Sequence, residues 1–438
     1  MKIKNNPAVL VLIGFAGVIV IGTILLSLPF MRAAGRAYSF VDILFTATSC
    51  VCVTGLTVVN ICDHYSLAGQ LVIMLLIQIG GLGYMTIASM IFLMVGKKLS
   101  IKERMATQTS VGQFSLHKVT DFVKYVVKLT LVIEIIGALL LFLAWFPVYG
   151  IKSIYYAIFH SISAFCNAGF TLFSDSLSSS ADNTVVILTI SFLIIIGGIG
   201  FIVVQDIKTR FKKKRFSYHA KIVLILTSFF VLVPAIIFLC SEYSNPHTIG
   251  MFGFWKKILI SFFHSVTTRT AGFNIIDING FLYMNVFIMF ILMFIGASPG
   301  GTGGGIKTTT FAVLFSSIRA MLRGTYEVDM YKRRVDEQVV QKSWIIFFLA
   351  LFLVALMIFL ILAVEGMAFR KVFFEVISAF GTVGLSMGVT SSLSWIGKLL
   401  IIITMFFGRL GPLTLGTTIY FKQEKLRYRF AEEKILIG

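Results

Sequence analysis

The sequence predicts an all-α polytopic membrane protein with four pseudo-repeated units of helix, re-entrant pore loop and helix around one central pore. Three observations predict this fold class: an apolar composition, four related glycine-containing stretches, and a second glycine motif behind each stretch. Hydrophobic residues make up 58% of the 438 residues and charged residues only 13%, whereas a soluble domain carries about 25% charged residues. This composition excludes an ordinary globular enzyme.

The net charge of +19 does not indicate a nucleic-acid partner. The lysines and arginines lie in the connections between apolar blocks, where they set topology and meet anionic membrane lipid. The cysteines offer only one close pair, Cys50 and Cys52, with no second pair or histidine cluster to complete a zinc-type site. We therefore expect no cofactor in this chain and no nucleic-acid partner.

Hydrophobic runs near the ~20 residues needed to cross a bilayer predict eight spans. They lie at about 8–30, 66–95, 122–147, 184–205, 221–240, 281–296, 343–364 and 396–420. The first run follows Lys2 and Lys4 and exceeds the 7–15 apolar residues of a signal peptide, so we interpret it as a retained helix. The predicted units are repeat 1 (1–96), repeat 2 (97–207), repeat 3 (208–322) and repeat 4 (323–421), with a cytoplasmic tail (422–438).

Between the two spans of each unit lies a semi-polar stretch that ends near a glycine. The four stretches are Leu44–Thr57, Phe159–Thr171, Phe263–Asn274 and Phe374–Ser386, and their glycines are Gly55, Gly169, Gly272 and Gly384. Successive glycines are 114, 103 and 112 residues apart, and the third stretch is one residue shorter than the others between its phenylalanine and its glycine. Such regular recurrence indicates an internal repeat.

These stretches have the residue types of a selectivity filter. Non-helical backbone at membrane depth is tolerated where it is buried in protein or lines a water-filled path. A half-helix that points its C-terminal end at the axis favours a cation, and a glycine lets carbonyl oxygens turn toward the ion. The candidate ligands, for potassium only, are the backbone carbonyls of Val53, Thr54, Gly55, Asn167, Ala168, Gly169, Thr270, Ala271, Gly272, Thr382, Val383 and Gly384.

A second glycine motif recurs in the last helix of each unit. It reads I-G-G-L-G from Ile79, I-G-G-I-G from Ile196, I-G-A-S-P-G from Ile295 and F-G-R-L-G from Phe407. Its first glycine falls 25, 28, 24 and 24 residues after the loop glycine of its unit. Glycines in membrane helices also mark close packing, but matched positions in four units favour the pore.

The third unit carries a candidate gate where its second helix meets a proline and many glycines, which cannot hold a regular helix. The gate residues are Gly296, Ala297, Ser298, Pro299, Gly300, Gly301, Thr302, Gly303, Gly304 and Gly305, with Arg409 at the matched place in the fourth unit. The alternatives are a passive kink or a phosphate loop, but the latter pattern is incomplete and follows no strand. An intramembrane charge such as Arg409 indicates function by default.

Four other charged residues lie in or near the predicted spans. Glu134 is expected to hydrogen-bond between helices. Lys307 either caps the broken helix or points to the cytoplasm. Asp42 and Asp175, near the outer mouth, either concentrate cations or are ordinary loop acids. By the positive-inside rule, the basic connections and both termini are cytoplasmic in a multi-pass cell-membrane protein.

At these motifs the chain resembles the Trk/Ktr/HKT superfamily of potassium uptake proteins, most closely the membrane subunit of Ktr systems. The specific pieces are T-G-L at Thr54, N-A-G-F at Asn167, R-T-A-G-F-N at Arg269, F-G-T-V-G at Phe380 and G-G-T-G-G-G-I-K-T-T-T from Gly300. Trk relatives have two further N-terminal helices, which favours Ktr. Gly55 stands where sodium-passing plant relatives often have serine, so the resemblance implies a preference for potassium.

The resemblance also implies how the protein works. It implies potassium uptake, a gate at 296–305 with Arg409, a homodimer with one pore per chain, and a separate cytoplasmic ring that binds nucleotide. Sodium as an activator is a family trait that the residues do not establish. The competing hypothesis is a secondary transporter with alternating access, although such folds usually show two repeats. A membrane enzyme is set aside, because the chain shows no paired carboxylates or H-x-x-x-H.

Overall fold

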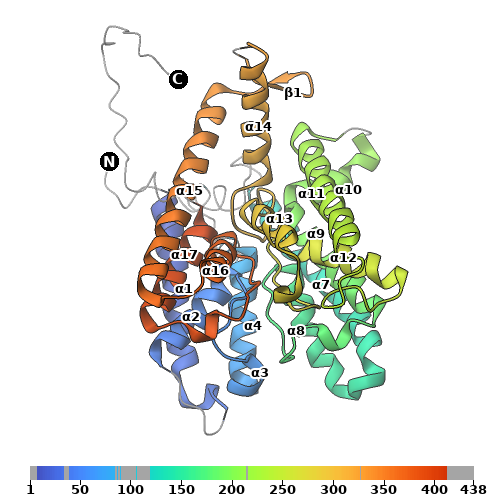
Figure 1. The fold of residues 1–438 in the computed structure, drawn as a ribbon, viewed down its shortest axis with the longest axis vertical. Helices are drawn as coiled ribbons and strands as arrows, with labels where there is room; N and C mark the ends of the chain where they lie inside the picture. Colours follow the sequence, from blue (N-terminus) through green and yellow to red (C-terminus); the bar gives the residue numbers. More distant parts are fainter. Residues whose placement is uncertain are drawn as a thin grey trace.

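The computed structural model describes residues 7–33, 39–83, 119–213, 216–325 and 327–411, together with Thr86, Ser89 and Met105. It is a helical bundle in which the four predicted units lie around a common centre (Figure 1). The 422–438 tail, the 96/97 boundary and much of the first basic connection lie outside the described residues. The predicted all-α membrane fold class is confirmed.

Each unit contributes a first helix, a half-helix and a second helix. The first helices are α1 (Pro7–Ser27), α7 (Val119–Tyr149), α11 (Tyr218–Glu242) and α15 (Glu337–Glu365). The half-helices are α2 (Phe40–Cys52), α8 (Ser153–Phe165), α12 (Phe254–Thr267) and α16 (Phe369–Gly381). The second helices are α4 (Leu67–Leu82), α9 (Thr184–Ile199), α13 (Tyr283–Phe294) and α17 (Trp395–Leu410).

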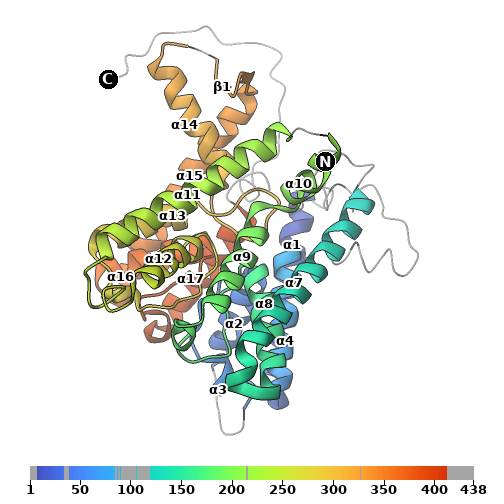
Figure 2. The same cartoon turned by 90° about the vertical axis from the view of Figure 1, so that its right-hand side faces the viewer.

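Shorter elements complete the chain. They are α3 (Ile61–His64), α10 (Phe201–Lys213), α14 (Thr308–Leu322), the 3-10 turns Pro29–Met31, Gly150–Lys152, Ser178–Ser180, Ile278–Gly280 and Thr390–Ser392, and the strands β1 (Asp329–Met330) and β2 (Arg333–Arg334). The two strands pair as an antiparallel hairpin. In Figures 1 and 2, α14 and this hairpin project from one end of the bundle, opposite α3.

Serine caps fix the start of several helices. Ser66 accepts a hydrogen bond from the Gly69 N–H at the start of α4, and Ser394 does the same from the Gly397 N–H at the start of α17. Such caps satisfy backbone N–H groups that have no partner in the first turn. The second helices of units 1 and 4 therefore begin in the same way.

Not every predicted span is one straight helix, and the predicted spans 66–95 and 396–420 extend beyond the described residues. Within the described residues, four helices are long and apolar enough to cross a membrane, or five if the bent pair α9–α10 counts as one. The predicted span 184–205 breaks at Gly200, whose φ is +101°, and its halves differ in direction by 97°. Hydropathy could not detect this bend, because the residues on both sides of Gly200 are apolar.

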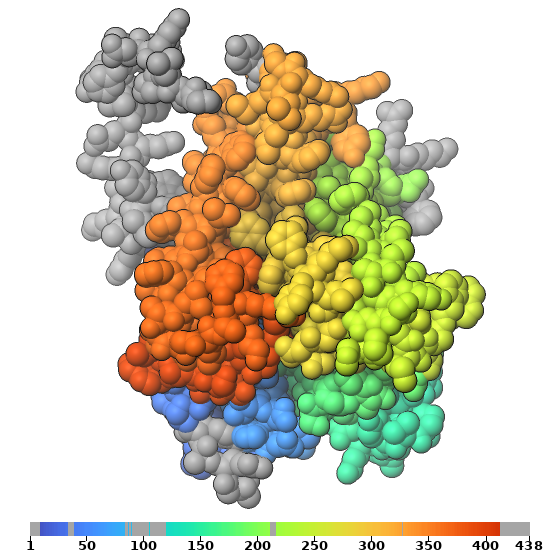
Figure 3. Space-filling model, in the orientation of Figure 1, coloured from blue at the N-terminus to red at the C-terminus, as the bar shows by residue number. Residues whose placement is uncertain are grey.

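The interior is organised around the half-helices. Four phenylalanines at matched positions, Phe45, Phe159, Phe263 and Phe374, are at most 1% exposed. The first helices instead expose large apolar side chains such as Ile135 at 66% and Phe352 at 67%. A lipid hydrocarbon core accommodates such a surface. The space-filling view shows the four units packed directly against one another (Figure 3).

Candidate ion pathway

The four glycine loops share one backbone conformation. Each begins, two residues before its glycine, with a left-handed residue: Val53 (φ 57°), Asn167 (57°), Thr270 (68°) and Thr382 (50°). The glycines Gly55, Gly169, Gly272 and Gly384 also have positive φ, between 69° and 92°. Only a few per cent of non-glycine residues adopt positive φ. Its recurrence at four matched positions shows that the four loops repeat in backbone conformation as well as in sequence.

The loops close into a ring. A Cβ atom added to Gly55 would overlap the carbonyl oxygen of Ala168, and one added to Gly169 would overlap that of Ala271. The same relation joins Gly272 to Val383 and Gly384 to Thr54. Each glycine therefore lies against the middle carbonyl of the next unit, and the fourth unit returns to the first. The predicted filter residues are thus brought together around one axis.

A small cavity lies beside this ring. It has a volume of about 170 Å³ and is lined by the four loop glycines together with polar residues that include Thr57, Asn60, Asn274 and Ser386. All four units line it, so the cavity is shared by the four glycine loops. Its polar lining suits a hydrated ion.

Side-chain hydroxyl groups of the half-helices, here called hydroxyl braces, hydrogen-bond to the backbone of the loops. The sequence analysis does not predict this role. Ser49 Oγ donates to the Leu56 carbonyl at 2.7 Å, and Ser163 Oγ donates to the Phe170 carbonyl at 2.8 Å. In the fourth unit, Ser378 Oγ accepts from the Gly384 N–H at 3.1 Å. The signal that could have identified them is a serine six residues before each of these glycines.

The third loop keeps the same brace despite its shorter length. Thr267 Oγ1 donates to the Phe273 carbonyl at 2.7 Å, although Thr267 precedes Gly272 by five residues rather than six. The missing residue therefore falls between the hydroxyl and the glycine. Thr270 restores the left-handed conformation, and its hydroxyl shares a 3.1 Å hydrogen bond with the Asn167 side-chain amide of unit 2.

The predicted gate residues 296–305 form a largely buried, non-helical loop between α13 and α14, and Arg409 lies on α17. On one side this loop, residues 295–307, is bound to unit 2. Ser298 N–H donates to the Gly198 carbonyl and Thr302 N–H to the Gly197 carbonyl, both at 3.0 Å. The Thr302 hydroxyl reaches the Phe165 carbonyl at the C-terminal end of half-helix α8 (3.2 Å).

On its other side the loop is bound to unit 4. Gly304 N–H donates to Thr382 Oγ1 at 2.9 Å, and Gly305 N–H donates to the Gly408 carbonyl at 3.3 Å. Gly303 packs against the Thr270 hydroxyl of the third glycine loop. Loop 295–307 therefore contacts the glycine loops of units 3 and 4 at Thr270 and Thr382.

Arg409 joins this loop to the remaining unit. Its guanidinium donates to the carbonyl oxygens of Thr302 and Gly80. One cation thus bridges a backbone carbonyl near the C-terminal end of α4 and one in the middle of the loop. Within the described residues, no carboxylate lies within 4.0 Å of this guanidinium.

The first glycines of the second motif, Gly80, Gly197, Gly296 and Gly408, show how the third unit differs. A Cβ on Gly80, Gly197 or Gly408 would overlap the carbonyl of Val51, Phe165 or Phe380, the residue four before each loop glycine. Gly296 instead lies against the Gly304 carbonyl. Three units therefore pack the second helix directly on the half-helix, and in the third the loop occupies that contact.

The remaining predicted residues have structural partners. Gln78 Nε2 donates to both carboxylate oxygens of Glu134, at 3.0 and 3.2 Å, between α4 and α7. Asp42 pairs with Lys398 at 2.7 Å, and Asp175 accepts from the Ser179 N–H at 2.7 Å. Lys307 Nζ donates to the Gly303 carbonyl at 2.7 Å and so does not extend to the cytoplasm. The described part of the chain holds no cluster of three potential metal-ligating side chains.

Comparison with known proteins gives a consistent result over the whole length. Residues 12–427 match the TrkH family model, described as a cation transport protein. The chain is 41% identical to the "Ktr system potassium uptake protein B" of Vibrio alginolyticus, covering 100% of this chain and 96% of that protein. It is 38% identical to the "Potassium/sodium uptake protein NtpJ" of Enterococcus hirae, covering 99% and 98%.

A solved structure shares the fold. The potassium transporter TrkH from Vibrio parahaemolyticus superposes with a TM-score of 0.76, covering 95% of this chain and 85% of that one. The sequence identity is only 18%, so the match concerns the fold alone.

Proposed function

This chain belongs to the TrkH family of cation transport proteins, and we propose that it conducts potassium across the cell membrane through the ring of four glycine loops. It is a transport protein and not an enzyme. Two of its similar relatives are named potassium uptake proteins, which supports potassium as the ion. The observation that carries the proposal is the ring in which each loop glycine lies against the next unit's middle carbonyl.

In this proposal the backbone carbonyls of the four loops replace the hydration shell of the ion. The half-helices α2, α8, α12 and α16 end at the loops, so the negative ends of their dipoles favour a cation there. The hydroxyl braces at Ser49, Ser163 and Thr267 fix the loops by hydrogen bonds to the carbonyl that follows each loop glycine. A rigid ring of this kind selects by the spacing and field of its carbonyls.

Loop 295–307 acts as the gate beneath this ring. Its hydrogen bonds to units 2 and 4, and the Arg409 bridge to Gly80, hold it across the path. A fixed positive charge at this depth also raises a barrier to potassium. Opening requires these bonds to be exchanged for others, which makes the loop a two-state element.

Regulation is proposed to come from outside the chain. The name "Ktr system" of similar relatives supports a multicomponent assembly, and we propose a cytoplasmic nucleotide-binding ring as the partner of a homodimer. The basic connections and both termini are assigned to the cytoplasm by the positive-inside rule. The potassium/sodium name of the Enterococcus hirae relative supports sodium as an activator or second substrate.

The alternative is a secondary transporter with alternating access, and the break in unit 2 at Gly200 favours it more than the sequence did. Broken helices near the midplane are common in such folds. The two mechanisms differ in energetics. Potassium accumulation driven by a sodium or proton gradient at zero membrane potential would support the transporter, and flux that follows the potassium gradient alone would support the pore.

The decisive experiment measures potassium and sodium uptake in a potassium-uptake-deficient cell for the wild type and Gly55→Ser. A side chain at Gly55 would be strained at φ +91° and would overlap the Ala168 carbonyl, so the preference for potassium over sodium should fall. Unchanged preference would contradict the filter assignment.

Two control variants separate the effect of backbone strain from the effect of the overlap with the Ala168 carbonyl. Gly366→Ser also has positive φ (+61°), but its site has nothing within 4 Å, so it tests backbone strain alone. Gly253→Ser has open space and normal φ at the N-cap of α12, where serine is favoured. Both should keep the wild-type ion preference.

A further inference from the structure

A second candidate binding site lies apart from the ring, along α14. A cavity of about 420 Å³ is lined by Ile222 and Leu226 of α11, Phe311, Ala312 and Phe315 of α14, and Tyr331 of the hairpin. Two arginines of α14, Arg319 and Arg323, line the same cavity. The site therefore combines an apolar floor with two cations at one end.

These arginines have no anionic partner within the described residues. All three ion pairs found there involve other side chains, and both arginines are exposed. Asp329 is the one carboxylate that lines the cavity among the described residues. Two more cations stand nearby: Lys221 lies 4.7 Å from the ring centre of Tyr331, and Arg333 lies 5.7 Å from that of Tyr218. The net charge around the cavity is positive, so an anion suits it.

The depth of the site favours a lipid headgroup over a soluble anion. α14 starts at Thr308, directly after the loop that crosses the path inside the membrane. At 1.5 Å per residue, Arg319 lies about 16 Å further along the helix, close to half of the ~30 Å hydrocarbon core. Phe315, one turn closer to the midplane, is 61% exposed. The apolar part of the cavity thus lies at acyl-chain depth and the arginines at headgroup depth.

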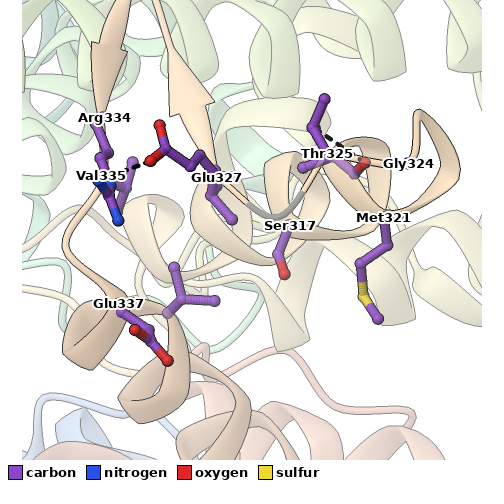
Figure 4. A pocket seen from close by; sticks show the side chains of 11 residues that line it. Ser317, Met321, Gly324, Thr325, Glu327, Arg334, Val335 and Glu337 are labelled. Carbon is purple, nitrogen blue, oxygen red and sulfur yellow. Dashed lines mark hydrogen bonds and ion pairs between the residues drawn. The ribbon is translucent and has the colours of Figure 1, made fainter.

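A neighbouring face of α14 provides an internal contrast. A cavity of about 460 Å³ there is lined by Glu327, Glu337 and Arg334 (Figure 4). Arg334 is already paired with Glu327 at 2.7 Å, which leaves Glu337 as an unneutralised acid. That cavity would repel a phosphate.

We propose that the cavity between α11, α14 and the β1–β2 hairpin binds an anionic phospholipid, with its phosphate on Arg319 and Arg323 and an acyl chain against Phe311 and Phe315. The bound lipid ties α14 to α11. Because α14 is continuous with loop 295–307, the lipid also stabilises the loop position seen here. Thr308 Oγ1 lies 3.0 Å from Ser298 Oγ, and Lys307 holds the Gly303 carbonyl, so a shift of α14 reaches the loop. This effect on the gate rests on the function proposed above, whereas lipid binding does not.

The test compares the purified full-length wild type with the double variant Arg319→Gln/Arg323→Gln. Both are placed in vesicles of equal phosphatidylglycerol and phosphatidylcholine, extracted mildly, and the retained lipids are counted by mass spectrometry. The wild type should retain phosphatidylglycerol preferentially. Each interfacial cation contributes roughly 1 kcal/mol, so each lost arginine should reduce that preference by about fivefold. Arg334→Gln, on the neighbouring face, should retain the wild-type preference.

Flux provides the second measurement. Rubidium flux of the wild type should be lower in phosphatidylglycerol vesicles than in pure phosphatidylcholine. In the double variant, this difference in flux between the two lipids should largely disappear. If the wild type carries no potassium or rubidium in any lipid, the proposed function fails, and lipid retention still decides the site.

Three outcomes would overturn the proposal. Equal phosphatidylglycerol retention by wild type and double variant would show that the arginines bind no lipid. An equal loss in Arg334→Gln would indicate diffuse surface attraction in place of a site. If the double variant keeps its lipid but loses binding of a cytoplasmic protein partner, the cavity is a protein-docking surface.

Discussion

Arg409, on the last helix of unit 4, donates a hydrogen bond to the carbonyl oxygen of Thr302 in the loop of unit 3. Two segments 107 residues apart in the sequence are thereby joined next to the ring of glycine loops. The guanidinium also bonds to Gly80 of unit 1, and Thr302 bonds to Gly197 of unit 2. All four units therefore meet at one contact, which makes it a suitable point of control.

Replacing Arg409 by glutamine should open the path. Hydrogen bonds to charged groups contribute about 1.5–3 kcal/mol each, so losing them should shift the equilibrium toward the open loop by tenfold or more. Rubidium flux in vesicles without any regulatory partner measures this. Arg409→Lys keeps the charge but cannot reproduce the planar fork that reaches two carbonyls, so it should give an intermediate flux. Unchanged flux in Arg409→Gln would remove this residue from the gate.

Gly304→Ala should push the loop away from the filter. An added Cβ would lie 2.5 Å from Thr382 Oγ1, the atom that accepts the hydrogen bond of the Gly304 N–H. We expect increased rubidium flux in vesicles, and deletion of residues 301–304 should have the same effect. Gly17→Ala is the matched control, because its site in α1 is open. A variant with normal flux and normal regulation would contradict the gate assignment.

Much of this arrangement could be predicted from the sequence, because it depends on recurring residues. The four loop glycines and the first glycines of the second motif predict the number of units, the loops that form the ring, and the unusual third unit. The serine braces recur equally clearly at Ser49, Ser163 and Ser378, but each serine lies within a half-helix, where its residue type does not indicate which carbonyl or N–H it will bind.

Other features could not be predicted, because they depend on contacts between distant segments. Hydropathy does not distinguish a straight apolar helix from one that turns by 97° at Gly200. The pairing of Asp42 with Lys398 joins residues 356 positions apart. Nothing near Asp42 in the sequence indicates whether its charge is neutralised, so the pairing with Lys398 is evident only in the structure.

The Asp42–Lys398 pair is expected to stabilise the fold and not to attract ions. Both side chains are largely shielded, with 17% and 14% exposed, and the pair joins α2 of unit 1 to α17 of unit 4. Removing one partner leaves the other charge shielded and unpaired, so Lys398→Met should lower the unfolding temperature. Asp42→Asn should do the same while the potassium concentration for half-maximal uptake stays unchanged. A large rise in that concentration would restore the cation-concentrating interpretation.

The hydroxyl braces should matter for selectivity more than for folding. Ser163→Ala removes the 2.8 Å hydrogen bond to the Phe170 carbonyl next to Gly169, and a buried carbonyl left without its partner costs about 1–3 kcal/mol. The loop can recover part of this free energy by rotating the peptide so that the carbonyl finds another partner, and this rotation disturbs the neighbouring glycine. We therefore expect a severalfold lower preference for potassium over sodium, measured by competitive uptake, at nearly normal expression. Ser343→Ala is the control: Ser343 Oγ makes an equally short 2.8 Å bond to the Val339 carbonyl within α15, far from the loops. If both variants change selectivity equally, the loss reflects general destabilisation, and the brace has no special role at the filter.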